Sequence, residues 1–359
     1  MFRPTQTSQL HPKRTDRFVR AVGWVLVVGS FPVWFALFAA PFLPLPATQR
    51  VVAAGSFAAV GEIMFWLGGA LLGVSVVRRF RKPNVRTGRS FADSSVAVVG
   101  ATGGLGAAVV GALVREGAST LAIGRDPVRL EELRAGRHCL STALADVSSE
   151  DSLAAAAAAT SELDALVIAT GTDVRKPLSD HSEADVRSQL DTNLAGAVFT
   201  VRAFANHIRE GGTIVILGGF GDGRLALPYY SVDVASRAGV AAFAQAMNRE
   251  FALEGRDLRV CYACPAPADT AAERPFAELW RKMGTPVVSP ERAADFVLTT
   301  TLQRKPVAIM GWQNALMTRV NAVSPWLANA FGLDSVSRHL RDAFGTPHAE
   351  PANWCKEIR

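Results

Sequence analysis

The sequence has few charged residues, and this scarcity limits the kinds of protein it can encode. Charged residues make up 19% of the 359 residues, whereas 49% are hydrophobic, and the net charge is +6. This balance is apolar for a soluble chain. Much of the Lys and Arg lies in two clusters, residues 3–20 and 78–89, each beside a long apolar run. This position is typical of the charge that flanks membrane spans, and we therefore expect no nucleic-acid partner.

Cysteine is also scarce, with four residues at positions 139, 261, 264 and 355. Cys261 and Cys264 form a C-x-x-C pair, but the pair ends a strand-like run and precedes Pro265. A redox pair usually opens a helix, whose N-terminus lowers the pKa of the thiol. A zinc site would need two more ligands, and no second C-x-x-C or H-x-x-x-H is present. We interpret the pair as two buried small side chains and predict no metal site.

Two long apolar runs precede the first polar stretch of the chain. Residues 21–49 contain no charge, and residues 51–77 contain only Glu62. Pro41, Pro44 and Pro46 separate the runs and predict a turn. Each run exceeds the roughly 20 residues that a helix needs to cross a bilayer. The first run is too long for a signal peptide, and a second run follows directly. The sequence therefore predicts two transmembrane helices.

The basic clusters lie outside the hairpin, while its turn holds only Arg50. By the positive-inside rule, both termini and everything after residue 77 should be cytoplasmic, in a two-pass protein of the cell membrane. Glu62 would be costly in lipid and is expected to face a partner helix or to lie near the outer interface. Gly68, Gly69 and Gly73 would allow close helix packing.

A glycine-rich turn begins the rest of the chain, after a polar linker. Residues 96–100 read as a buried strand, and the segment Gly100 to Gly106 reads G-A-T-G-G-L-G before a helix over residues 107–115. Glycines allow the tight turn, let the backbone approach a pyrophosphate, and let the helix pack on the strand. The free N–H groups at the helix start would then bind the anion.

Further strands alternate with helices along the chain. We predict strands over residues 120–124, up to Val147, and over 165–171, with a helix over 127–133. This alternation predicts an α/β fold, a doubly wound parallel-sheet Rossmann domain preceded by the transmembrane hairpin. The expected divisions are a basic cytoplasmic N-terminus (1–20), the two spans (21–77), a linker (78–94), the Rossmann domain (95–310) and a C-terminal helical segment (311–359).

Residues 95–310 resemble the short-chain dehydrogenases/reductases. The glycine turn is similar to the family's T-G-x-x-x-G-x-G, with Val99 in place of Thr, and residues 168–171 (I-A-T-G) stand where the family has N-N-A-G. Asn193 matches the family's active-site asparagine. Residues 264–270 (C-P-A-P-A-D-T) are similar to its P-G-x-x-x-T loop. The resemblance implies a dinucleotide site at Gly100, Thr102, Gly103, Gly104, Leu105, Gly106, Arg125, Asp146, Val147, Ala169, Gly171, Arg237, Pro265 and Thr270.

The residue after the second strand indicates which dinucleotide is preferred. An acidic residue there would accept hydrogen bonds from the ribose hydroxyls of NAD. This chain has Arg125 followed by Asp126. Because Arg125 could pair with a 2′-phosphate, we favour NADP, with NAD as the alternative that Asp126 keeps open.

The resemblance fails at the catalytic positions, where the family has Ser, Tyr and a Lys four residues after the Tyr. Residues 236–243 (S-R-A-G-V-A-A-F) match the family's helix, which places Arg237 at the Lys position and Asp233 at the Tyr position. Gly218 and Gly219 stand where the family has serines. Pairing with Arg237 would keep Asp233 ionised, whereas burial would favour its protonated form.

Two tyrosines near Asp233 are the other candidate acids. Tyr229 and Tyr230 lack a Lys four residues later, and no Tyr-x-x-x-Lys exists in the sequence. If the helix already includes Tyr229, that residue lies one turn before Asp233, too far to replace it without rearrangement. The candidate catalytic residues are therefore Asn193, Asp233, Arg237, Tyr229 and Tyr230.

The C-terminal segment is apolar and tryptophan-bearing. Residues 307–310 read as the last strand, and the helical pattern that follows breaks at Pro325. This segment should cover the substrate cleft or lie on the membrane surface, where a lipid-like substrate would suit it. The first hypothesis is a membrane-anchored NADP-dependent oxidoreductase that acts on an apolar carbonyl or hydroxyl.

Two further hypotheses remain open. The replaced Ser, Tyr and Lys favour a cofactor-binding scaffold or sensor in a membrane complex, which leaves it uncertain whether the chain is an enzyme. Atypical Rossmann chemistry such as epimerisation would still need an acid or a base. By analogy with the family, a homo-oligomer is plausible, and a scaffold would need a membrane-protein partner.

Overall fold

The computed structural model describes residues 13–42, 44, 46–81, 90–135, 140–221 and 223–345. The chain divides into two compact units, one ending at Val85 and one beginning at Arg86. Residues 1–12 and 82–89 of the two basic clusters lie outside the described residues, as do Cys139 and Cys355.

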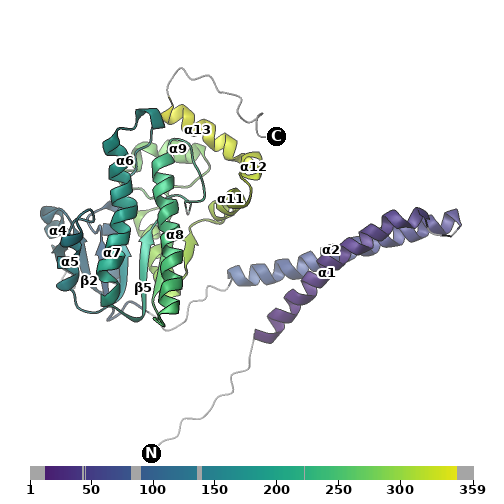
Figure 1. The fold of residues 1–359 in the computed structure, drawn as a ribbon, viewed down its shortest axis with the longest axis horizontal. Helices are drawn as coiled ribbons and strands as arrows, with labels where there is room; N and C mark the ends of the chain where they lie inside the picture. Colours follow the sequence, from purple (N-terminus) through teal and green to yellow (C-terminus); the bar gives the residue numbers. More distant parts are fainter. Residues whose placement is uncertain are drawn as a thin grey trace, which may run out of the picture. The chain divides into compact units, whose positions relative to one another are not determined.

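The first unit is a pair of long helices, α1 (Lys13–Ala39) and α2 (Ala47–Arg81), joined through the short 3-10 helix η1 (Ala40–Phe42). The two helices pack along each other (Figure 1). Residues 21–39 and 47–70 are long and apolar enough to cross a membrane, and about a tenth (11%) of each stretch is buried. Helices with so many outward-facing apolar side chains suit a lipid environment better than water.

Glycines set the contact between α1 and α2. A Cβ at Gly68 would lie 2.9 Å from the carbonyl oxygen of Gly23, and one at Gly61 would collide with the ring of Trp34. Gly69 faces no atom within 4 Å, so only Gly68 of these two neighbours provides the expected close packing. Glu62 is exposed and accepts a hydrogen bond from Trp66 Nε1 at 3.2 Å.

The second unit is built on a seven-stranded, all-parallel sheet of order β3-β2-β1-β4-β5-β6-β7. This order confirms the predicted doubly wound Rossmann fold, because the chain reverses direction across the sheet between β1 and β4. The strands are β1 (Ser95–Val99), β2 (Ser119–Gly124), β3 (Leu140–Leu144), β4 (Leu163–Ile168), β5 (Ile208–Leu217), β6 (Arg259–Cys264) and β7 (Val307–Ile309).

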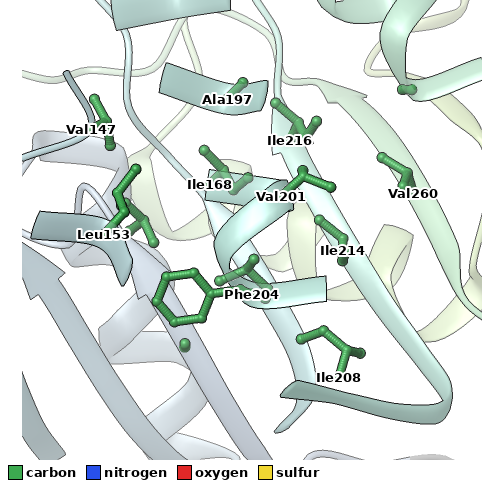
Figure 2. Packing of buried hydrophobic residues seen from close by; sticks show 14 of the residues in the cluster. Val147, Leu153, Ile168, Ala197, Val201, Phe204, Ile208, Ile214, Ile216 and Val260 are labelled. Atoms are coloured by element: carbon green, nitrogen blue, oxygen red, sulfur yellow. The ribbon is translucent and has the colours of Figure 1, made fainter. Parts of the chain in front are cut away.

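Helices cover both faces of this sheet, and Figure 1 views one of these faces. One core cluster joins the sheet to α5 (Glu150–Ala158), α7 (Gly196–Phe204) and α8 (Ser231–Leu253). Its side chains, among them Leu153, Phe204, Ile168 and Ile214, interlock between α5, α7 and the strands (Figure 2). The other cluster joins the sheet to α3 (Gly104–Arg115), α4 (Pro127–Arg134) and α10 (Pro290–Gln303).

The remaining elements lie at or near the carboxyl ends of the strands, the edge where parallel sheets bind ligands. They include α6 (Glu183–Leu190), the π-helical turn η3 (Asp191–Ala195) and α9 (Ala277–Lys282), with short 3-10 turns η2 (Leu178–Asp180) and η5 (Arg274–Phe276). The 3-10 turn η4 (Ala205–His207) instead lies at the amino end of β5, which it directly precedes. A C-terminal series follows β7, made of α11 (Trp312–Val323), α12 (Pro325–Ala328), the π-helical turn η6 (Asn329–Leu333) and α13 (Asp334–Phe344).

Several element boundaries differ from the sequence-based prediction. Strand β3 ends at Leu144 and β4 at Ile168, so Asp146, Val147, Ala169 and Gly171 stand in the loops beyond them. Helix α3 begins at Gly104, three residues earlier than expected, because its first turn is formed by the glycine turn itself. The break at Pro325 is confirmed, since Ser324 caps α12 through a hydrogen bond from Leu327 N.

Candidate active site

The glycine turn has the geometry of an anion site. Gly100 has a φ of +82°, and the N–H groups of Gly100 and Ala101 donate to Ile123 O at 2.9 and 3.0 Å. Gly103 is the N-cap of α3, and no side chain caps the helix there. The first N–H groups of α3 therefore have no side-chain acceptor and are available to a phosphate.

The glycines of this turn leave no room for a side chain. A Cβ at Gly106 would lie 2.1 Å from Gly100 O, and one at Gly104 would lie 2.7 Å from Cγ2 of Thr270. The second contact shows that the loop after β6 crosses directly over the turn. The structure thus brings together the two segments that the sequence placed around one dinucleotide, although they are more than 150 residues apart.

The residues that would distinguish NAD from NADP, which differ at the adenosine ribose, follow the end of β2. Asp126 is the N-cap of α4 and accepts from Val128 N and Arg129 N at 3.0 and 3.2 Å. Its carboxylate is therefore occupied by the helix. The Arg125 side chain is 79% exposed, with Asp146 as a distant partner at 4.0 Å.

Asp146 is held by its own loop. Its Oδ1 accepts hydrogen bonds from Ser148 N and Ser148 Oγ at 2.9 and 2.7 Å, and these bonds lower the pKa of the Asp146 carboxyl. Val147 is buried, and it packs close to the backbone of Gly196 on α7. Their place at a dinucleotide stays a prediction from the resemblance.

A cavity of about 430 Å³ opens between the glycine turn and the start of α8. It brings together candidate site residues from four separate segments of the sequence. These are Leu105, Ala169, Gly171, Tyr230, Asp233, Arg237, Pro265 and Thr270.

Asn193 and Asp233 belong to one hydrogen-bond network beneath this cavity. Asn193 sits in η3, and its amide both accepts from Thr172 N at 2.8 Å and donates to Thr172 O at 2.9 Å. The same Nδ2 lies 3.2 Å from Asp233 Oδ1 and 3.0 Å from Ser236 Oγ. The π-helical turn displaces the helix locally, and such turns are frequent at functional sites.

Asp233 and Arg237 form the salt bridge that their spacing predicted. Arg237 Nε donates to Asp233 Oδ1 at 3.1 Å, and Arg237 Nη1 donates to Leu217 O at 3.1 Å. The two side chains are 11% and 14% exposed. Burial raises the pKa of Asp233, and the charge of Arg237 opposes this effect without reversing it. The direction of this shift favours a carboxyl that holds its proton more tightly than usual.

Gly218 and Gly219 differ in the room they leave. A Cβ at Gly218 would lie 2.6 Å from the Tyr262 ring and 2.8 Å from Cys264 Sγ. A Cβ at Gly219 would meet only Asp233 Oδ2 at 3.6 Å and the Arg237 side chain from 3.7 Å. Gly219 therefore faces the Asp233–Arg237 pair.

The two candidate tyrosines lie before α8 rather than within it. Tyr229 has a φ of +66°, does not line the cavity, and has its hydroxyl beside Gly345 near the end of α13. Tyr230 does line the cavity, but its hydroxyl is shielded from solvent and has no hydrogen-bond partner among the described residues. Burial raises the pKa of Tyr230. Tyr229 is therefore not placed to exchange a proton with a molecule in the cavity, whereas Tyr230 remains a candidate at its wall.

Arg175 is the site residue that the sequence analysis missed. Its guanidinium pairs with Asp173 at 2.7 Å and with Glu273, and it lies over the ring of Phe276 at 4.4 Å. Glu273 Oε2 also accepts from Trp280 Nε1 at 2.8 Å. This buried group forms the outer wall of the cavity. The charged residues that directly follow the fourth strand were the signal that would have indicated it.

The Cys261 and Cys264 side chains lie on opposite faces of the sheet. Cys261 packs in the cluster beneath α3 and α10, and Cys264 in the cluster beneath α7 and α8. Burial raises the pKa of Cys261 to about 12. The interpretation as buried small side chains is consistent with this arrangement. Within the described ranges, no three His, Cys, Asp or Glu side chains are grouped to hold a metal.

Comparisons with known proteins agree with this geometry. The short chain dehydrogenase family matches residues 94–279. An uncharacterized oxidoreductase of Mycobacterium tuberculosis is 28% identical over 195 residues, covering 51% of this chain and 71% of the relative. A 3-dehydrosphinganine reductase of Arabidopsis thaliana is 27% identical over 184 residues, covering 49% and 55%.

A solved structure supports the fold independently. The short chain dehydrogenase from Burkholderia cenocepacia, crystallised in complex with NADP, superimposes with a TM-score of 0.56 at 23% identity. The match covers 72% of this chain and all of that one. Because the family match spans just over half of the 359 residues, the chain belongs to the short chain dehydrogenase family.

Proposed function

We propose that this protein is an NADP(H)-dependent oxidoreductase that interconverts a carbonyl and a hydroxyl group on an apolar substrate. One observation carries the proposal. Asp233, whose carboxyl has a raised pKa, borders the cavity between the glycine turn and the Pro265–Thr270 loop. An acid at this place in the family's fold is positioned to exchange a proton with a substrate oxygen.

The residues present fit a dinucleotide phosphate. The uncapped start of α3 would hold the pyrophosphate. Arg125 is exposed and only distantly paired with Asp146, so it could pair with a 2′-phosphate, while Asp126 Oδ1 is already engaged by the start of α4. The relative from Burkholderia cenocepacia was crystallised with NADP, which supports the same preference.

The chain's own residues would then carry out the proton chemistry. The bound cofactor supplies or accepts a hydride at its nicotinamide ring. Asp233 gives a proton to the carbonyl oxygen during reduction and takes one from the hydroxyl during oxidation. Arg237 keeps this carboxyl in place and has a second N–H group bound to Leu217 O. Asn193 Nδ2 donates a second hydrogen bond to Asp233 Oδ1 and so also holds the carboxyl in place.

Two features favour an apolar substrate at a membrane. The cavity is lined by Leu217, Phe220, Leu227, Val234 and Trp280 as well as by its polar groups. The relative from Arabidopsis thaliana is named a 3-dehydrosphinganine reductase, which supports a substrate of this kind. Helices α1 and α2 would hold the enzyme at the bilayer, with both termini and the Rossmann unit on the cytoplasmic side.

A cofactor-binding scaffold or sensor is the second candidate function. Asp233 Oδ1 already accepts from both Asn193 and Arg237, so this part of the family's catalytic centre is tied up in internal contacts. The Ser, Tyr and Lys of the family are absent as well. Such a protein would bind the dinucleotide and report it to a membrane partner without turnover.

A titration followed by a turnover assay separates the two functions. The full chain in detergent or nanodiscs should bind NADPH more tightly than NADH, as measured by the fluorescence of the nicotinamide. It should then transfer the nicotinamide C4 deuterium of labelled NADPH to long-chain ketones. Asp233→Asn should keep NADPH binding and lose deuterium transfer. Binding with no transfer to any carbonyl, unchanged in Asp233→Asn, would favour the scaffold.

A further inference from the structure

The C-terminal series exposes an unusual amount of apolar surface. Six large hydrophobic side chains of α11, α12 and η6 are between 38% and 86% exposed. They are Trp312, Leu316, Val323, Trp326, Leu327 and Phe331. Exposed apolar side chains in such number on neighbouring elements are typical of an interaction site. We call these six residues the C-terminal apolar face.

The exposed side chains of α11 lie on one side of a helix whose other side is packed against the protein. Trp312, Leu316 and Val323 are four and seven residues apart, so they lie on one side of α11. The opposite side is anchored, because Thr318 is fully buried and Asn321 Nδ2 donates to Arg224 O. Figure 1 shows α11, α12 and α13 following one another along the outside of the Rossmann unit.

The composition of the face favours lipid over water. Between Trp312 and Leu333 the sequence carries one charge, Arg319, which is exposed three residues after Leu316 on the same side of α11. Exposed tryptophans and a basic residue without acidic neighbours are typical of helices that lie in the headgroup region of a bilayer. The same chain carries two candidate spans, which would keep lipid at a high effective concentration around this unit.

A second cavity of about 530 Å³ opens at this face. Trp312 and Phe331 line it and are 74% and 70% exposed, so they form its rim. Its walls are mostly apolar and include Met283, Val288, Met310, Met317 and Val336. It shares Phe220, Leu227 and Ala266 with the cavity that holds Asp233, so the two spaces adjoin.

We propose that the C-terminal apolar face lies on the lipid surface and that the second cavity admits the hydrocarbon chain of a membrane-resident molecule through the Trp312–Phe331 rim. The chain would fill the second cavity while its polar end reaches the first. The contact with lipid is independent of the proposed function. Only the description of the bound molecule as a substrate rests on it.

Depth measurements on the full chain in liposomes test the lipid contact. A nitroxide label is placed at Trp326→Cys, in a background with Cys139→Ser and Cys355→Ser, because Cys261 and Cys264 are buried. Leu253→Cys is the matched control, since Leu253 is an 88% exposed apolar residue on the last turn of α8, outside the face. The liposomes contain phosphatidylcholine and phosphatidylglycerol.

The expected result is a reversal of accessibility between the two labels. The label at position 326 should be relaxed more by oxygen, which concentrates in lipid, than by a water-soluble nickel chelate, and the label at 253 should show the opposite. Equal exposure to the chelate at both positions would overturn the proposal. So would protection of position 326 from both reagents, because that outcome means a protein cover, from a second copy or from residues 346–359.

A photoreactive lipid tests the cavity. A long-chain alcohol bearing a diazirine at the end of its chain is incorporated into the same liposomes and irradiated. Adducts on residues 283–288 and 310–317 are expected, and Trp312→Ala with Phe331→Ala should change their yield at least severalfold. Adducts confined to α1 and α2 would refute entry through the rim. Neither measurement depends on turnover, so failure of the proposed function leaves them interpretable.

Discussion

Replacing Arg237 by Met should make the stability of the second unit depend on pH. Arg237 is the group that lowers the pKa of Asp233 against the effect of burial, and the remaining charges near this carboxyl, Asp173 and Arg175, oppose each other. In Arg237→Met the pKa of Asp233 should therefore rise further. Leaving one charge of a buried pair without its partner costs about 3–5 kcal/mol when that charge stays ionised.

The direction of the pH effect follows from proton linkage. A carboxyl whose pKa is higher in the folded than in the unfolded state binds more protons when folded, so the free energy of unfolding falls as the pH rises between the two values. The fall is up to about 1.4 kcal/mol per pH unit for one proton. Below the unfolded value the penalty disappears, because both states are protonated. Arg237→Met should thus be least stable at the highest pH.

Thermal and urea unfolding of the detergent-solubilised chain between pH 5 and 8 would measure this slope. The double variant Arg237→Met with Asp233→Asn is the matched control, since it removes the titrating group and should show the flatter profile. If Arg237→Met follows the same profile as the double variant, Asp233 is not the desolvated acid that the geometry implies, and the proposed proton donor is wrong.

Three further predictions concern the cofactor and the acid. Gly106→Ala should lower NADPH affinity at least tenfold, because its Cβ would meet Gly100 O at 2.1 Å, whereas Gly111→Ala on the same helix faces open space and should leave it unchanged. Arg125→Ala should lower NADPH affinity about tenfold, the strength of one charge-assisted hydrogen bond, and leave NADH affinity unaltered in the same fluorescence titration. The rate of carbonyl reduction should fall as the pH rises through the raised pKa of Asp233, and a pH-independent rate would rule out Asp233 as the donor.

The fold and the cofactor half of the site were predictable because local signals determine them. The glycine turn needs residues without a side chain. Gly100 has a positive φ, and Gly106 lies so close to the carbonyl oxygen of Gly100 that no Cβ would fit. Alternating strands and helices then restrict the sheet to a few parallel strand orders. The Asp233–Arg237 pair was predictable from its four-residue spacing on one helix.

The electrostatic state of the site was not predictable, because it depends on tertiary burial. The spacing of Asp233 and Arg237 indicates a salt bridge but not whether burial or the partner charge determines the pKa. The role of Arg175 was not predictable either, because its partner Glu273 is almost 100 residues away in the sequence. The ends of β3 and β4 were also misplaced by a few residues, because strand ends depend on sheet partners rather than on local sequence.

The two neighbouring glycines at the end of β5 offer a final test of where the substrate oxygen binds. Gly219→Ser would add a side chain whose nearest neighbours are Asp233 Oδ2 at 3.6 Å and Arg237, so the hydroxyl fits beside the acid. One added donor to a developing oxyanion should raise the rate of carbonyl reduction about tenfold, which corresponds to about 1.4 kcal/mol.

Gly218→Ser is the matched control, because its Cβ would collide with Tyr262 at 2.6 Å and distort the strand end. It should lower both NADPH binding and reduction. If Gly219→Ser binds NADPH normally and gains no activity, the substrate oxygen does not bind between Gly219 and Asp233. The presence of Asp233 and the absence of the family's serine would then not be explained by carbonyl reduction. The sensor function would become the better explanation of this site.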